Sequence, residues 1–165
     1  MITKEQVKGS LEANWRLHQA KVYLVLWGIL TAVMFFISFC YAAAKGMPDA
    51  ALWASGILAL VYAAVFLPFS GVSYCKYLRI INRWEKYESY TVTLDRPGTS
   101  YFYNRSVYYT VRFHTESGKE VTADTMPLWS GAAFALYQLE DYNNKKIRIL
   151  YDPEEEKIVV LGPAK

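Results

Sequence analysis

The sequence contains few of the residues that most often carry out chemistry. Among its 165 residues are two cysteines, Cys40 and Cys75, and two histidines, His18 and His114. Both cysteines lie within or at the edge of long apolar segments, and neither histidine has a cysteine or carboxylate at metal-ligand spacing. Glycine-rich phosphate loops, His-Glu metalloprotease motifs and activated serine motifs are also absent from it. The sequence therefore predicts no metal site, no cofactor and no catalytic residues, and it argues against an enzyme.

Two long segments, residues 22–44 and 50–75, contain no charged residue. At ~1.5 Å per residue, each is long enough as a helix to cross a hydrocarbon core of roughly 30 Å. Only residues 45–49 separate them, so we expect an antiparallel two-helix transmembrane hairpin over residues 22–75. The first segment is too long for the core of a signal peptide, typically ~7–15 residues, and we expect it to be retained. The absence of charge within both segments argues against an ion or proton path through this chain alone.

Residues 1–21 form an amphipathic segment ahead of the hairpin. Thr3 and Gln6 have the spacing of a capping box. Apolar residues then recur every four positions, at Val7, Leu11 and Trp15. Two interpretations remain open, a helix lying in the membrane interface and a frayed polar terminus, because Gly9 and Ser10 weaken a helix.

Small residues on both apolar segments predict close packing of helices, either within the hairpin or against a partner. These residues are Gly28, Ala32, Ser55, Ala59 and Ala63.

Basic residues gather on the two flanks of the predicted hairpin, whereas the turn has only Lys45. The second flank is predicted to be a juxtamembrane helix over residues 76–88. Its basic residues are spaced by three, four and three positions: Lys76, Arg79, Arg83 and Lys86. The positive-inside rule therefore predicts a multi-pass protein of the cell (inner) membrane with both termini in the cytoplasm. The four residues either contact lipid headgroups or serve as an ordinary topology anchor.

From residue 89 the apolar pattern changes to a period of two, which is typical of half-buried strands. Strands are expected near residues 90–94, 107–114, 120–125, 146–151 and 157–161, with a helix over residues 128–141. Three strands, one helix and two strands are the order of an OB-type barrel. The fold class is therefore a membrane helical hairpin followed by a small OB-like β-barrel module over residues 89–165, with one helix between its third and fourth strands.

An aromatic cluster in this module is the strongest candidate for ligand binding. It consists of Tyr101, Phe102, Tyr103 and Tyr108, with Arg105 and Arg112 nearby. Such aromatic side chains can stack on bases or sugar rings, but they also suit a strand core or a loop resting on the bilayer. Residues 85–165 carry ten Lys or Arg and twelve Asp or Glu, which argues against nucleic acid as the ligand.

Two short motifs mark the end of the chain. Gly118, Lys119 and Glu120 precede a strand, and residues 146–161 contain Tyr151, Asp152 and Pro153 before an acidic stretch and an apolar strand. With these motifs the chain resembles an uncharacterised bacterial family, a domain of unknown function. Members of this family attach a small β module to membrane helices, and in plan they are similar to NfeD-type OB modules. The resemblance implies an architecture and no activity.

These patterns favour a non-enzymatic integral membrane protein whose hairpin anchors a cytoplasmic β module. The expected partners are the lipid bilayer and either another membrane protein or a second copy of the chain. Two alternatives remain: a module that senses a small molecule, sugar or nucleic acid at the aromatic cluster, and an enzyme at the membrane surface.

Overall fold

The computed structural model describes residues 2–46, 48–95, 97–100, 106–125, 128–129 and 144–163. Its residues form two compact units. One unit combines residues 1–15 with residues 77–165, and the other consists of residues 16–76.

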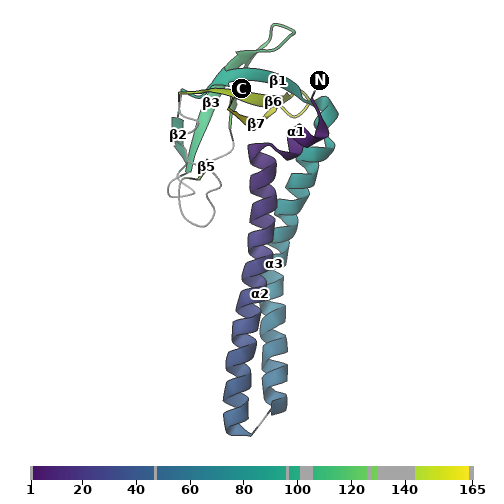
Figure 1. Ribbon diagram of the computed structural model, residues 1–165, viewed down its shortest axis with the longest axis vertical. Coiled ribbons are helices and arrows are strands. Elements are labelled where there is room, and N and C mark those ends of the chain that lie inside the picture. The colour runs from purple at the N-terminus through teal and green to yellow at the C-terminus, as the bar shows by residue number, and fades with distance from the viewer. Residues whose placement is uncertain are drawn as a thin grey trace. The chain divides into compact units, whose positions relative to one another are not determined.

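The unit of residues 16–76 is made from two long apolar helices, α2 (Leu11–Lys45) and α3 (Pro48–Asn82), which run side by side (Figure 1). Ser70 Oγ donates to the carbonyl oxygen of Ala20 at 3.0 Å. Further along the pair, Trp27 Nε1 donates to the carbonyl oxygen of Ala59 at 3.4 Å. These partners show that the helices are antiparallel, which confirms the predicted helical hairpin.

The other unit contains all the described strands (Figure 1). Its strands are β1 (Glu88–Thr93), β2 (Pro97–Ser100), β3 (Ser106–His114), β4 (Glu120–Asp124), β5 (Leu128–Trp129), β6 (Lys146–Asp152) and β7 (Lys157–Pro163). They form two antiparallel sheets, one in the order β1-β6-β7 and one in which β3 pairs with β2, β4 and β5. The described strands do not join into one closed sheet, so the structure shows a small antiparallel module rather than a completed barrel.

Two short strands, β2 and β5, were not expected from the sequence. The predicted helix over residues 128–141 is wrong at its start, because Leu128 and Trp129 pair with Val107 and Ser106 of β3. Pairing with a neighbouring strand outweighs the local helix preference of these two residues. Residues 130–141 lie outside the described part of the chain.

The two inner faces of the sheets enclose the larger core cluster. Its members come from five strands, from Leu94 directly after β1 and from the start of α2. Large side chains among them are Tyr109, Tyr151, Leu94, Ile147, Ile149 and Phe113. Alternation along β3 follows the sequence prediction, because Val111 and Phe113 are buried while Arg112 and His114 are exposed. The period of two therefore identified correctly which side of this strand faces the core.

A second, smaller cluster covers the opposite face of the β1-β6-β7 sheet. It joins Leu150 of β6 and Val159 of β7 to Val7 of α1 (Lys4–Lys8) and to Tyr87, which follows η1 (Trp84–Lys86). The amphipathic N-terminal segment thus packs against the sheet of its own unit. Neither interpretation drawn from the sequence described this arrangement.

The N-terminal segment is two helices rather than one. α1 has the predicted capping box, in which Gln6 N–H donates to Thr3 Oγ1 at 3.3 Å and Thr3 N–H donates to Gln6 Oε1 at 3.1 Å. α1 ends at Lys8 with Gly9 as its C-cap, and Ser10 caps α2 by accepting from the Ala13 N–H at 3.3 Å. Glycine raises the cost of continuing a helix and serine is a favoured N-cap, which explains the break.

Candidate functional site

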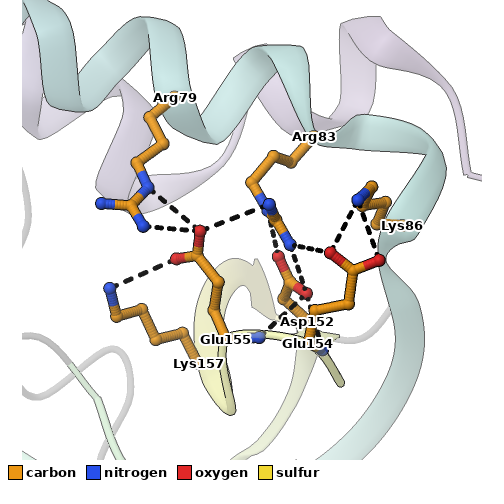
Figure 2. A network of polar contacts seen from close by, with 7 residues as sticks. All are labelled: Arg79, Arg83, Lys86, Asp152, Glu154, Glu155 and Lys157. Carbon is orange, nitrogen blue, oxygen red and sulfur yellow. Dashed lines mark hydrogen bonds and ion pairs between the residues drawn. The ribbon is translucent and has the colours of Figure 1, made fainter.

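A network of charged side chains links the last turns of α3 and η1 to the turn between β6 and β7 (Figure 2). The basic members are Arg79, Arg83, Lys86 and Lys157, and the acidic members are Asp152, Glu154 and Glu155. All seven belong to the unit that contains the sheets. This network is the densest group of ion pairs among the described residues.

The centre of the network is the pair Arg83–Asp152. Arg83 Nε and Nη2 donate to the two carboxylate oxygens of Asp152, the second at 3.0 Å, which makes the pair bidentate. The Asp152 side chain is 2% exposed and that of Arg83 is 22% exposed. A bidentate, shielded pair of this kind has a defined geometry and is less screened by water than a surface pair.

The turn itself holds the Asp152 carboxylate in place. Oδ1 of Asp152 accepts from the backbone N–H groups of Glu154 at 3.0 Å and Glu155 at 3.3 Å. This is the local hydrogen-bonding pattern for which aspartate is favoured at the start of turns. The turn closes with Glu156 at a φ of 51°, in the left-handed region.

The outer pairs are more exposed than the central one. Glu155 Oε1 accepts from Nε and Nη2 of Arg79 at 3.0 and 2.7 Å. Lys86 Nζ donates to both carboxylate oxygens of Glu154 at 2.8 and 2.6 Å. Arg83 joins the outer and central parts, because its Nη2 also donates to Glu154 Oε2 at 2.9 Å.

The network keeps its acids ionised. Burial acts to raise the pKa of Asp152, but the hydrogen bonds from Arg83 and from the Glu155 and Glu154 backbone N–H groups outweigh it, so that this pKa lies below its ordinary value. The pKa of Glu154 is lowered chiefly by Lys86, and that of Glu155 chiefly by Arg79. At neutral pH the turn therefore presents carboxylates rather than proton donors.

Three of the four residues predicted to contact lipid headgroups belong to this network. Arg79, Arg83 and Lys86 lie beside acidic side chains of the turn, while Lys76 is exposed and belongs to the hairpin unit. Contact with headgroups remains a prediction for all four. The sequence pattern predicted that these basic residues lie along one side of a helix. It did not predict the acidic turn that faces them, because that turn is distant in the sequence: Arg83 and Asp152 are 69 positions apart.

The structure describes only part of the predicted aromatic site. Tyr108 is half-buried and Arg112 is exposed, and both lie on β3. Tyr101, Phe102, Tyr103 and Arg105 lie outside the described residues. Binding at this cluster therefore remains a prediction.

The small residues of the two helices fall into two groups. Ser55 is buried and Ala59 and Ala63 are half-buried, on the side of α3 that carries the buried Ser70. Gly28 and Ala32 are exposed on α2, and a Cβ added at Gly28 would meet nothing within 4 Å. Gly28 and Ala32 therefore do not take part in the packing of α2 against α3, and their packing against a partner remains a prediction.

A sequence signal for the covered sheet face existed and was missed. Ile149, Leu150 and Tyr151 are consecutive and all buried, as are Ile158, Val159 and Val160. A continuous apolar run on a strand indicates a sheet that is buried on both faces. This pattern could have shown that another segment packs on the second face of β6 and β7.

The described residues contain no group of three or more His, Cys, Asp or Glu side chains that could hold a metal ion. Cys40 and Cys75 are free and exposed on α2 and α3. No protein family, curated protein or solved structure matches the chain. The resemblance to the bacterial family with a Tyr-Asp-Pro strand stays a prediction.

Proposed function

We propose that this chain is an integral membrane protein whose α2–α3 hairpin anchors the sheet module at the cytoplasmic face of the cell membrane. The observation that carries the proposal is the large number of bulky apolar side chains exposed along both helices. Examples are Leu24, Phe36, Trp53, Leu60 and Phe69, whose exposed fractions run from 45% at Leu24 to 76% at Trp53.

Exposure of this extent distinguishes the hairpin from the core helices of a water-soluble protein. Two helices of the described chain are long and apolar enough to cross a membrane, Leu11–Lys45 and Leu52–Asn82, and their apolar windows are 0% and 6% buried. Contiguous apolar surface exposed to water would cause aggregation, whereas lipid tails solvate it well.

The start of α2 supports retention of the first helix. Leu11, in its first turn, belongs to the larger core cluster of the sheet module, and Val7 just before it belongs to the smaller one. Cleavage after the first apolar segment would remove both side chains from the cores. A removable signal peptide would not supply part of the core of the mature fold.

The order of contacts supports an OB-like arrangement of the module. β1 lies against β3 and β4 lies against β7, in addition to the hydrogen-bonded pairs β1–β6, β6–β7 and β3–β4. These five pairs of neighbouring strands are the pairs expected in a partly open five-stranded barrel. We propose that the module is such a barrel with its two sheets incompletely joined.

The role of this anchored module is to bind another membrane protein or a second copy of the chain. Purification in a mild detergent should give a stoichiometric complex or a defined homo-oligomer, and a strictly monomeric protein without a partner would contradict this part of the proposal.

Membrane anchoring and orientation can be tested with single cysteines in a chain carrying Cys40→Ser and Cys75→Ser. Alkaline carbonate should leave the protein in the membrane fraction. A membrane-impermeant maleimide should label Asp49→Cys in intact cells and Ser117→Cys only after permeabilisation. Carbonate release would contradict anchoring, and the reverse labelling pattern would contradict the cytoplasmic placement of the module.

A further inference from the structure

The ion-pair network has an inner part and an outer part. The inner pair, Arg83–Asp152, is shielded. In the outer pairs the basic side chains are exposed: Arg79 is 62% exposed against 17% for Glu155, and Lys86 is 47% exposed. Water and salt weaken exposed ion pairs, so the outer pairs are held much less firmly than the inner one. Arg79 and Lys86 can therefore change partners while Arg83 stays on Asp152.

The place of Arg79 in its helix suggests a competing partner. Arg79 follows the apolar segment that ends at Cys75 by four residues of α3, about one helical turn or roughly 6 Å. If that segment spans a bilayer, as the proposed function requires, Arg79 lies at the depth of the lipid headgroups. Anionic headgroups attract lysine and arginine there with a strength comparable to that of an exposed ion pair.

The carboxylates of the turn and the phosphates of lipid headgroups accept hydrogen bonds in a similar way. A carboxylate and a phosphate each offer several oxygen acceptors, and each can receive the parallel N–H donors of a guanidinium. Glu155 already receives two N–H groups of Arg79, and Glu154 receives Lys86 through both of its oxygens. A lipid phosphate could replace either carboxylate without a change in the geometry of the donor.

We propose that Arg79 and Lys86 exchange between the carboxylates of Glu155 and Glu154 and the phosphates of anionic lipid headgroups. In this arrangement the acidic turn competes with anionic lipids for the same basic side chains. Arg83, held by Asp152, keeps the end of α3 and the turn together while the outer residues exchange. This inference rests on the proposed membrane anchor. It adds anionic lipid as a binding partner and the acidic turn of the same chain as the competitor for the basic side chains.

The test measures retention of phosphatidylglycerol by the full chain in mild detergent, using native mass spectrometry. Neutralising the competitor with Glu154→Gln and Glu155→Gln should raise the affinity for this lipid by about fivefold or more. Adding Arg79→Gln and Lys86→Gln to that variant should remove the gain. Phosphatidylcholine, which carries no net charge, should be retained equally by all variants.

A matched control removes the same number of negative charges elsewhere. Glu116 is exposed in the β3–β4 turn, and Glu156 pairs with Lys119 at 2.9 Å rather than with α3 or η1. Glu116→Gln with Glu156→Gln should leave retention of phosphatidylglycerol unchanged. An equal gain in this control would show that net charge alone governs binding, and it would overturn the proposal.

Two further results would also overturn it. The first is an unchanged affinity for phosphatidylglycerol when Glu154 and Glu155 are neutralised. The second is displacement of the lipid by inorganic phosphate at a similar concentration, which would indicate a site for small anions. If the neutralised variant does not fold, Arg79→Gln with Lys86→Gln in the otherwise unchanged chain must lower retention about fivefold. Carbonate extraction separates the two proposals, because a protein that stays in the membrane without a selective lipid response contradicts the exchange and leaves the anchor intact.

Discussion

Asp152 is the residue on which the ion-pair network depends most. Its carboxylate receives two donors of Arg83 and two backbone N–H groups of the turn that follows β6. A carboxylate buried to this degree is tolerated because all these donors compensate its loss of hydration. The same residue therefore shapes the turn and attaches it to the end of α3.

Replacing Asp152 with asparagine should lower the free energy of unfolding of the sheet module by about 2 kcal/mol. This is less than the roughly 3–5 kcal/mol expected for a wholly buried pair, because Arg83 keeps Glu154 and Glu155 as partners. Hydrogen exchange at the backbone amides of β6 measures the change within the module. Glu156→Gln, a control in the same turn, should alter exchange little, and equal effects of the two substitutions would contradict a special role for Asp152.

The network also predicts a pH dependence of stability. The pKa values of Asp152, Glu154 and Glu155 are lowered on folding from ordinary values of 3.8 for Asp and 4.5 for Glu. The unfolded chain then takes up protons first, so the stabilisation is complete above these ordinary values and is lost as the pH falls through the lower pKa values of the folded state.

Denaturant unfolding followed at several pH values should show that the stabilisation from these acids stays constant between pH 5 and 7 and declines below about pH 4.5. Asp152→Asn should make the decline shallower, because one of the three titrating acids is gone. An unchanged slope in this variant would show that other groups control acid unfolding.

At the scale of single elements, the N-terminal helices are parts of the sheet module. Val7 of α1 belongs to the smaller core cluster with Leu150 and Val159, and Leu11 of α2 belongs to the larger core cluster. The C-terminal end of α3 faces the β6–β7 turn. These elements complete the two cores that the strands leave open. The N-terminal helices therefore have a structural role in the sheet module and do more than connect to the hairpin.

Leu11→Ala should destabilise the module by about 3 kcal/mol, the range found for large-to-small changes in a core. The readout is again hydrogen exchange at β6, which lies far from position 11 in the sequence. Leu24→Ala, a control on the exposed side of the same helix, should leave this exchange unchanged. A loss confined to α2 itself would contradict the packing of Leu11 in the module core.

Periodicity predicted much of this fold because it reflects local geometry. The alternation of Val111 and Phe113 with Arg112 marked β3, and the capping pair Thr3 and Gln6 marked α1. The pairing of Arg83 with Asp152 could not be predicted, because charges alone do not say which distant partner a side chain meets. For the same reason Leu128 was assigned to a helix, although β3 draws it into a strand.

At the scale of the whole molecule, the chain forms one of its two units from separated segments. Residues 1–15 and 77–165 build the sheet module, and residues 16–76 build the helical pair. The helices are thus an insertion within the module rather than an extension of it. Both flanks of the insertion contribute side chains to the cores.

Deleting residues 2–10 should weaken the module while the hairpin remains intact. The deletion uncovers Leu150 and Val159, which Val7 shields in the smaller cluster. Limited proteolysis in detergent should then cut the sheet module sooner and leave a protected fragment containing both apolar helices. A control with Lys4→Ala and Lys8→Ala, which keeps Val7, should resist proteolysis like the unchanged chain, and equal resistance of the deletion variant would contradict the prediction.

The discontinuous module has a consequence for synthesis of the protein on the ribosome. Val7 and Leu11 emerge early, but their core partners Ile149, Leu150 and Val159 emerge roughly 140 residues later, about 7–30 s at usual rates of translation. Both apolar helices are made during that interval. The N-terminal segment must therefore wait, unpaired, until the last two strands arrive, and the module can close only after the hairpin has been completed.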